Sequence, residues 1–221
     1  MRNVLVIAAH ADDEVLGVGG TIALHSARGD NVYLLSLCDR SMNHKRSEIE
    51  VNRLRKSVLK VCRILGIKEV IFGGLEDEKL ELLSAIDQIE KAIGQFKPNI
   101  IYTHSDIDTN QDHRVTLHAT AISTRTYSEN FVDKVYTYEV LSSSEQGAFY
   151  TRRFNPNVYV EISDVIEKKC EAISVYEKEV SAFPYPRSLD GIDALAKVRG
   201  MEIGVPYAEA FELVRERIKL L

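Results

Sequence analysis

Near the amino terminus, residues 4–14 read VLVIAAHADDE. The first six residues form a continuous apolar run, which is typical of a strand that is covered on both faces of a sheet. The run stops at a histidine and three acidic residues, without the small-residue cleavage site of a signal peptide. We therefore predict that 4–9 is the buried first strand of an α/β fold, with polar side chains at its carboxyl end.

The same alternation of apolar strand and amphipathic helix continues to residue 141. The patterns predict strands at 4–9, 32–38, 70–73, 99–104 and 135–140, and helices at 20–28, 47–65, 80–96 and 115–125. Short connections between alternating strands and helices are typical of a mainly parallel sheet with helices on both faces. This α/β architecture is the fold class that the sequence predicts.

Beyond residue 141 the alternation loosens. The sequence predicts a strand at 159–162, helices at 164–180 and 192–203, and an extended segment at 207–213. No repeat, low-complexity tract or flexible linker separates this region from the rest. We therefore expect one domain over 1–221, made of a parallel α/β core (1–141) and a C-terminal region of strands, helices and a cap (142–221).

Composition narrows the class of protein. The 221 residues are 45% hydrophobic and carry a formal charge of −5, which gives no electrostatic footprint for nucleic acid. The three cysteines are widely spaced, so we expect reduced thiols in a cytoplasmic protein rather than a disulfide framework or a thiolate zinc site. No run of apolar residues is long enough for a transmembrane segment, and none is expected.

Charged and imidazole side chains gather at the carboxyl ends of two predicted strands. Residues 10–14 (HADDE) follow the first strand, and residues 104–114 (HSDIDTNQDHR) end and follow the fourth. Ligands of open parallel sheets bind beyond the carboxyl ends of the strands. So many carboxylates would repel one another unless a divalent cation lay between them. His10 and Asp13 are three residues apart in a tight turn, so both can face one ion while Asp12 points elsewhere.

Two other interpretations of the first cluster are weaker. A dinucleotide-binding loop would use the glycines of 17–20 with Asp39, but Ile22 stands where the third glycine belongs, and three acidic residues occupy the place of a pyrophosphate. An aspartate that caps the following helix would explain one acidic residue. It would not explain His10 together with three acidic residues.

The second cluster resembles the start of a calcium-binding EF-hand loop, because acidic or amide residues alternate from 106 to 112. It lacks the required glycine, which is replaced by Gln111, and the final glutamate, which is replaced by Leu117. Imidazole combined with carboxylate favours zinc or a similar transition metal. Two histidines and one aspartate, with a position left for water, are typical of a catalytic zinc site.

On these motifs the sequence resembles the PIG-L/LmbE family of zinc-dependent N-deacetylases, which includes N-acetylglucosaminyl-phosphatidylinositol de-N-acetylase. The signature A-H-[P/A]-D-D-E with G-x-G-G occurs at 9–14 and 17–20, and H-x-x-x-D-x-[H/N]-x-D-H occurs at 104–113. The tail also matches, at Arg199-Gly200, Gly204 and 207–211 (YAEAF). The resemblance implies a Rossmann-like three-layer sandwich. It also implies removal of the N-acetyl group from an N-acetylglucosamine-type sugar or its conjugate, releasing acetate and a free amine.

Residue roles follow from the resemblance by position. It implies that His10, Asp13 and His113 bind Zn²⁺ and that Asp12 is the general base that deprotonates the attacking water. Asp112 would hold a neighbouring imidazole. Asn110 stands where many members have a histidine; it can donate a hydrogen bond to an oxyanion but cannot supply a proton. Either Asp12 returns the proton it has taken, which we prefer, or His104 replaces the missing histidine.

Further residues are expected to contact the substrate. The resemblance places an arginine of the second helix there, and Arg53 and Arg55 are both candidates. His104 and Tyr207 complete the predicted substrate-binding set. The implied partner is a small N-acetylated sugar, zinc is the only cofactor expected, and the trimers and hexamers of relatives imply a homo-oligomer. Two alternatives stay open: a zinc amidohydrolase of a non-sugar amide, and a non-catalytic metal- or nucleotide-binding module.

Overall fold

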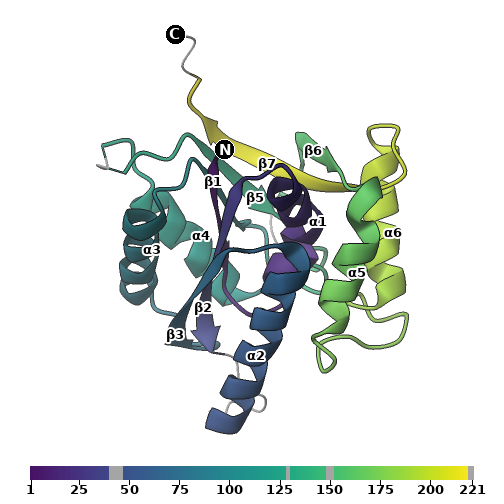
Figure 1. Cartoon of the computed structure of the whole chain (residues 1–221), viewed down its shortest axis with the longest axis horizontal. Coiled ribbons are helices and arrows are strands. Elements are labelled where there is room, and N and C mark those ends of the chain that lie inside the picture. The colour runs from purple at the N-terminus through teal and green to yellow at the C-terminus, as the bar shows by residue number, and fades with distance from the viewer. Residues whose placement is uncertain (40–46, 128–129, 148–151, 219–221) are drawn as a thin grey trace.

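One seven-stranded sheet forms the centre of the molecule (Figure 1). The computed structural model describes residues 1–39, 47–127, 130–147 and 152–218. The strand order is β3-β2-β1-β4-β5-β7-β6. The five parallel strands are β1 (Asn3–Ala8), β2 (Asn31–Asp39), β3 (Glu69–Glu76), β4 (Ile100–His104) and β5 (Lys134–Tyr138). β7 (Ala208–Glu216) runs antiparallel between β5 and β6 (Val158–Glu161), so the predicted mainly parallel sheet is confirmed.

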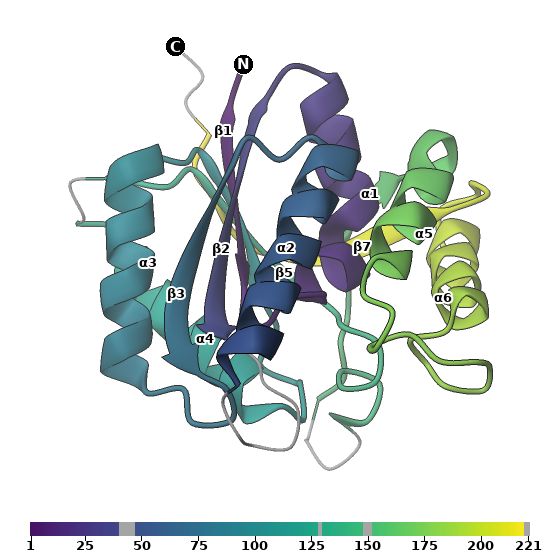
Figure 2. The same cartoon turned by 60° about the horizontal axis from the view of Figure 1, so that its bottom comes forward.

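Helices cover both faces of the sheet and complete three layers (Figure 2). One face carries α1 (Asp13–Ala27), α2 (Glu48–Leu65), α5 (Ile166–Ser174) and α6 (Leu189–Met201), and the other carries α3 (Leu82–Phe96) and α4 (Gln111–Ser123). Alternate residues of β1 enter different cores: Val4 and Val6 pack under α1 and α2, and Leu5 and Ile7 pack under α3 and α4. This burial on both faces explains the unbroken apolar run.

The order of the strands reverses at β1. The chain passes from β1 to β2 and β3 on one side and then returns to place β4 and β5 on the other. β4 pairs directly with β1, with Val4 opposite Ile100 and Val6 opposite Tyr102. The carboxyl ends of β1 and β4 therefore meet at the switch point of the sheet, where open α/β folds bind ligands.

The start of α1 differs from the prediction. The helix begins at Asp13 rather than at Gly20, so the acidic residues occupy its first turn and the glycines lie inside it. A Cβ atom on Gly17 would overlap the ring of Tyr138, and one on Gly20 would lie 2.6 Å from Ile162 Cγ2. Because glycine has no Cβ atom, the helix can lie this close to its neighbours. Glycine also has a weak helix propensity, so the sequence pattern did not predict helix before residue 20.

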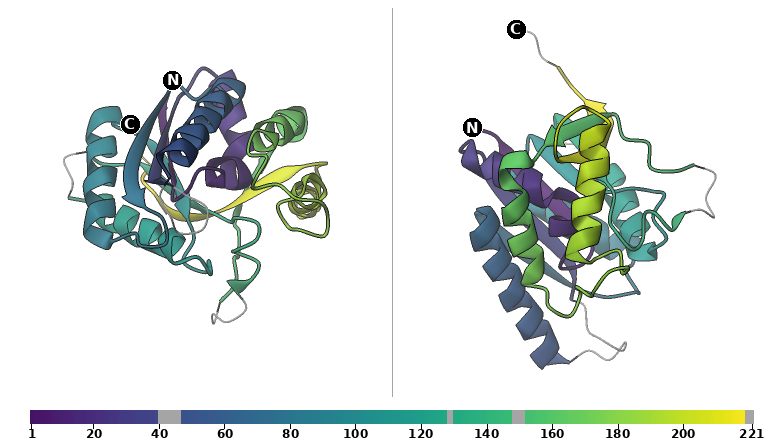
Figure 3. Two further views of the ribbon diagram at one scale, coloured as in Figure 1. Left: turned by 90° about the horizontal axis from the view of Figure 1, so that it is seen from below. Right: turned by 90° about the vertical axis from the view of Figure 1, so that its right-hand side faces the viewer.

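The predicted helix 164–180 is also wrong in its extent. A 3₁₀ turn (Ser163–Val165) leads into α5, which ends at Ser174. Residues 175–180 instead form a loop that comes back to the start of α1, where Tyr176 is buried. The two cap helices, α5 and α6, lie side by side beyond α1 (Figure 3).

A buried ion pair joins this C-terminal region to α1. Glu209 of β7 accepts hydrogen bonds from the backbone N–H groups of Gly20 (2.9 Å) and Thr21 (2.8 Å). Lys169 of α5 donates to Glu209 Oε1 (2.6 Å) and to the carbonyl of Leu16 (2.9 Å). These buried polar contacts therefore hold the cap against α1.

Among the described residues, no helix is both long and apolar enough to cross a membrane.

Candidate metal centre

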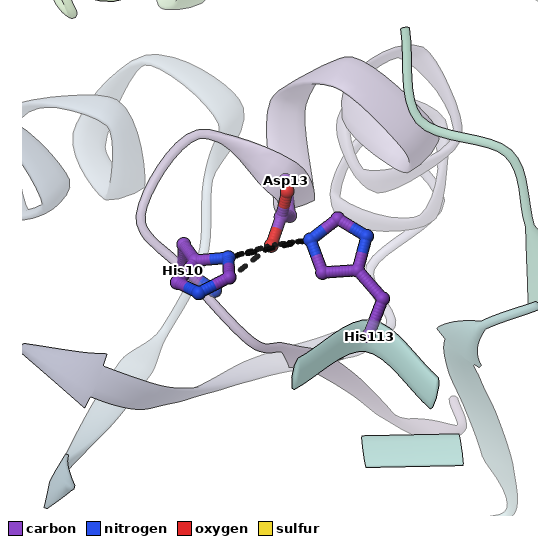
Figure 4. A group of neighbouring side chains, drawn as sticks. All are labelled: His10, Asp13 and His113. Atoms are coloured by element: carbon purple, nitrogen blue, oxygen red, sulfur yellow. Dashed lines mark hydrogen bonds and ion pairs between the residues drawn. The ribbon is translucent and has the colours of Figure 1, made fainter. Parts of the chain in front are cut away.

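Three side chains from two distant segments converge at the switch point (Figure 4). His10 follows β1, Asp13 opens α1, and His113 lies in the first turn of α4. His10 Nδ1 lies 3.3 Å from His113 Nε2 and 3.4 Å from Asp13 Oδ2, and His113 Nε2 lies 3.3 Å from the same oxygen. All three side chains are buried. Their three donor atoms form a nearly equilateral triangle.

Carboxylates hold both imidazoles from the side away from the triangle. Asp108 Oδ2 lies 2.9 Å from His113 Nδ1. Asp112 Oδ2 and Asp77 Oδ1 lie 3.1 Å and 3.0 Å from His10 Nε2. A carboxylate at one ring nitrogen favours a proton there and leaves the lone pair of the other nitrogen toward the triangle. Both imidazoles therefore adopt the orientation that metal binding requires.

The electrostatics of the triangle favour positive charge. Burial lowers the pKa of His113, but the carboxylates of Asp13 and Asp108 outweigh burial and raise it to about 9. Burial raises the pKa of Asp13, but the charge of His113 and the hydrogen bond from His10 outweigh burial and hold it well below its usual range. Asp13 Oδ1 is buried and has no hydrogen-bond partner within the described part of the chain. This donor set fits a divalent transition metal ion.

Asp12 lies next to this triangle and is fully buried. It occupies the N-cap position of α1, yet its side chain makes no capping hydrogen bond. Its Oδ2 instead accepts a hydrogen bond from Arg187 Nη1 at 2.7 Å, and the Arg187 Nε donates to Ser142 Oγ at 2.6 Å. The helix-capping interpretation of this residue therefore does not hold.

The other predicted catalytic residues lie at the start of α4. Asp112 accepts hydrogen bonds from the backbone of Glu78 (2.7 Å) and Leu80 (3.3 Å), so it ties the loop after β3 to His10. Asn110 is the N-cap of α4, with its Oδ1 accepting from the backbone N–H of Asp112 at 2.8 Å. The amide NH₂ of Asn110 is the group that can still donate to a substrate.

His104 lies behind the triangle and is fully buried. Its Nε2 accepts a hydrogen bond from the backbone N–H of Ala9 (3.0 Å) and lies 3.3 Å from Asp13 Oδ2. Its ring stacks on His113 with centroids 3.9 Å apart. Burial and the charge of His113 lower the pKa of His104 to about 4, so the ring is neutral at physiological pH. The structure thus places His104 against the cluster rather than at a surface.

The three other predicted substrate residues are spread over the molecule. Arg55 donates two hydrogen bonds, of 2.9 and 2.7 Å, to Asp39 at the end of β2. Arg53 is exposed, 3.7 Å from Glu177. Tyr207 packs against the core on the α1 side of the sheet, and its ring lies 5.6 Å from the Lys197 ammonium of α6.

Several residues around the site were missed by the sequence analysis as parts of it. Asp108 belongs to the second motif. Its position five residues before His113 was the sequence feature that could have indicated its contact with that histidine. Asp77 comes from another part of the chain, and no local pattern pointed to it. The pairing of Arg187 with Asp12 was also missed. Glu14 and Tyr176 also meet here, with Tyr176 OH 2.5 Å from Glu14 Oε1.

The fold and this geometry define a class: a three-layer α/β protein with a buried two-histidine, one-aspartate centre at the switch point of its sheet. Residues 5–123 match the PIG-L family, described as GlcNAc-PI de-N-acetylase. Since the match covers more than half of the 221 residues, the chain belongs to the PIG-L family. The predicted family and its fold are thereby confirmed.

Named relatives are similar over most of their length. Diacetylchitobiose deacetylase of Thermococcus kodakarensis is 27% identical over 97% of this chain and 84% of its own. A probable N-acetyl-alpha-D-glucosaminyl L-malate deacetylase 2 of Bacillus cereus is 26% identical over 82% of this chain and 85% of its own. The solved structure of GalB, the 4-carboxy-2-hydroxymuconate hydratase of Pseudomonas putida, superposes with a TM-score of 0.80 at 22% identity. The superposition covers 100% of this chain and 99% of that chain. That likeness shows the fold alone.

Proposed function

We propose that the protein is a zinc-dependent hydrolase that removes the N-acetyl group from an N-acetylglucosamine-type sugar or its conjugate. Acetate and a free amine are the products. The observation that carries this proposal is the triangle of His10, Asp13 and His113 with a second buried carboxylate, Asp12, beside it. Two relatives named as deacetylases of N-acetylglucosamine-containing compounds support the substrate class.

The donor set of the triangle supports zinc. Its three donor atoms lie 3.3–3.4 Å from one another, so His10, Asp13 and His113 could hold one ion together. Imidazole combined with carboxylate favours zinc or a similar transition metal, whereas magnesium prefers oxygen ligands. Three protein ligands are the number found in catalytic zinc sites, whereas structural sites use four.

Zinc in this site would supply Lewis acidity toward water and toward the amide carbonyl. The chain's own residues supply the proton transfers. Asp12 accepts the proton of the attacking water and returns it to the departing nitrogen, a role worth about 10²–10⁴ in rate. Arg187 fixes Asp12 Oδ2 through a 2.7 Å ion pair, so the carboxylate is held before substrate arrives.

Asn110 and Asp112 support the reaction from α4. The Asn110 amide, whose oxygen is engaged in capping, offers its NH₂ to the developing oxyanion; an aimed donor of this kind contributes about 3 kcal/mol. Asp112 orients His10 through its Nε2. His104, which is neutral and fully buried, stacks on His113 and accepts a hydrogen bond from the Ala9 N–H, so it serves as a packing support for the centre rather than as an acid.

Between the two candidate arginines, Arg55 is the better substrate contact. It lines a cavity of about 570 Å³ beside Asp39, at the carboxyl edge of the sheet. Its guanidinium is already oriented by two hydrogen bonds to Asp39. Arg53 instead faces Glu177 across a groove between α2 and the loop after α5.

The test is a panel of amides assayed for free amine. Purified protein would be given zinc, then N-acetylglucosamine, N,N′-diacetylchitobiose and an N-acetylglucosaminyl conjugate, with N-acetylated amino acids as the non-sugar arm. We expect amine release from the sugars, at least about tenfold faster than from the amino acids, lost on chelation and restored by zinc. Faster release from the amino acids would favour a non-sugar amidohydrolase. No release with no bound metal would favour a non-catalytic module.

We also propose a cytoplasmic location and a homo-oligomeric state, a trimer or hexamer. Three free cysteines, two of them buried, support a reducing compartment. Light scattering after size-exclusion chromatography would test the oligomer, and a monomeric mass would contradict it.

A further inference from the structure

The backbone of Asp12 has a positive φ, which a residue other than glycine rarely adopts unless surrounding contacts stabilise it. Its φ is 112°, in the left-handed half of the map that favours glycine. Such a conformation persists only where surrounding contacts determine it. The next residue, Asp13, belongs to the triangle, so the turn that directs Asp13 inward is the turn that strains Asp12.

Two buried side chains provide the contacts on this turn. Glu14 Oε2 accepts a hydrogen bond from the backbone N–H of Asp12 at 3.0 Å. The other oxygen, Oε1, accepts one from Tyr176 OH at 2.5 Å. Glu14 is fully buried and Tyr176 is 2% exposed, so water does not offer an easy replacement for either bond. The chain from Tyr176 to Glu14 to the Asp12 amide is therefore continuous and dry.

The same loop reaches the other end of Asp12. Tyr176 and Glu179 both lie in residues 175–180, after α5. Glu179 Oε2 lies 3.6 Å from Arg187 Nη1, which is bonded to the carboxylate of Asp12. One loop of the C-terminal region thus contacts the backbone of Asp12 through Glu14 and its side chain through Arg187.

We propose that Glu14 and Tyr176 are positioning residues that hold Asp12 in the conformation it needs as general base. The inference rests on the proposed function, because it assigns Asp12 that role. Neither residue is expected to touch substrate or metal; each acts through the Asp12 backbone. The C-terminal loop then sets the geometry of the base, and loss of the bond from Tyr176 lowers turnover without removing the metal.

The first test compares two tyrosine-to-phenylalanine variants. Tyr176→Phe removes only the hydroxyl that binds Glu14. Tyr102→Phe is the matched control: Tyr102 is 4% exposed and its OH lies 3.1 Å from His25 Nε2, near the C-terminal end of α1. We expect Tyr176→Phe to lower kcat at least about tenfold, with KM and zinc content unchanged, as a displaced base should. We expect Tyr102→Phe to change thermal stability but not kcat.

The second test uses Glu14 itself. Glu14→Gln keeps an oxygen for the Asp12 N–H and an amide that can bond Tyr176, so kcat should stay within about threefold of wild type. Glu14→Ala loses both bonds and should lose at least as much kcat as Tyr176→Phe. If Glu14→Ala does not fold, the comparison of Tyr176→Phe with Tyr102→Phe still decides the proposal.

Hydrogen exchange at the Asp12 amide provides a readout that does not depend on turnover. Its N–H should exchange at least about tenfold faster in Tyr176→Phe than in wild type or Tyr102→Phe. If wild type deacetylates no sugar, the proposed function fails, and the exchange rates still test whether these residues hold Asp12. Wild-type kcat and wild-type exchange in Tyr176→Phe, with at most a lower melting temperature, would overturn the proposal.

Discussion

Adjacent aspartates have separate surroundings because the turn between β1 and α1 sends them in different directions. Asp13 faces His10 and His113, and Asp12 faces Arg187. The sequence indicated this division, since a three-residue spacing lets His10 and Asp13 face one ion. It could not indicate the partner of Asp12, because Arg187 is 175 residues away along the chain.

Asp12→Asn should retain zinc and lose turnover. The amide preserves the size of the side chain but cannot accept the proton of the attacking water, so kcat should fall by about 10²–10⁴. Zinc content and kcat measured on the same preparation would check this. A helix-capping role predicts a different result, a stability loss of about 1 kcal/mol with activity intact. Turnover at the wild-type rate would remove Asp12 from the mechanism.

His25 predicts a pH dependence of stability that is independent of the metal centre. Burial, the largest effect, lowers the pKa of His25 below its usual 6.5, although Asp30 opposes it. The unfolded chain therefore takes up the proton first, and the contribution of His25, full above pH 6.5, is lost as the pH falls toward the lowered value. The advantage of wild type over His25→Gln in free energy of unfolding should be smaller at pH 5 than at pH 7.5. An equal advantage at both pH values would contradict this.

At the scale of elements, α1 shows what a sequence pattern can and cannot locate. The strand before it and the glycines within it were visible, but the glycines made its first two turns look like a loop. Gly17 lies close to Tyr138 and Gly20 lies close to Ile162, and both contact residues follow more than a hundred positions later in the chain. Tertiary contact outweighs local propensity here, and no local pattern reports such contact.

Alanine at these glycines should be costly, whereas alanine at a third glycine should not. Gly17→Ala and Gly20→Ala force a methyl group against Tyr138 and Ile162, and overpacking of this kind costs about 1–3 kcal/mol. Gly94, inside α3, has nothing within 4 Å of an added Cβ, so Gly94→Ala should gain about 0.5–1 kcal/mol. Urea unfolding measures all three. A loss at Gly94 as large as at Gly17 would refute the packing explanation.

At the scale of the whole molecule, the site is assembled from distant parts of the chain. β1 and β4 bring the two motifs together, the loop after β3 adds Asp77, and the C-terminal region adds Tyr176 and Arg187. The two motifs and the mainly parallel sheet could be predicted, because each lies within a short stretch of sequence. The contributions from the loop after α5 could not, because the periodicity of 164–180 suggested a continuous helix.

We propose that 1–221 unfolds as one domain, because the cap is tied to α1 by Lys169 and Glu209. Lys169→Met leaves a buried carboxylate without its cation and should cost about 3–5 kcal/mol. Lys197→Met, on the same cap, breaks an exposed pair with Asp193 and should leave the free energy of unfolding nearly unchanged. Tyrosine fluorescence and far-UV circular dichroism should give coincident transitions in urea. Two separate transitions would show that the cap and the core are independent.

The most direct test of the account is the zinc content of single-histidine variants. His113 and His118 lie on the same helix, but His113 belongs to the buried triangle and His118 is exposed. Elemental analysis should find about one zinc per chain in wild type and in His118→Ala, and almost none in His113→Ala. Full zinc occupancy in His113→Ala, or none in wild type supplied with zinc, would contradict the metal centre on which the proposed chemistry depends.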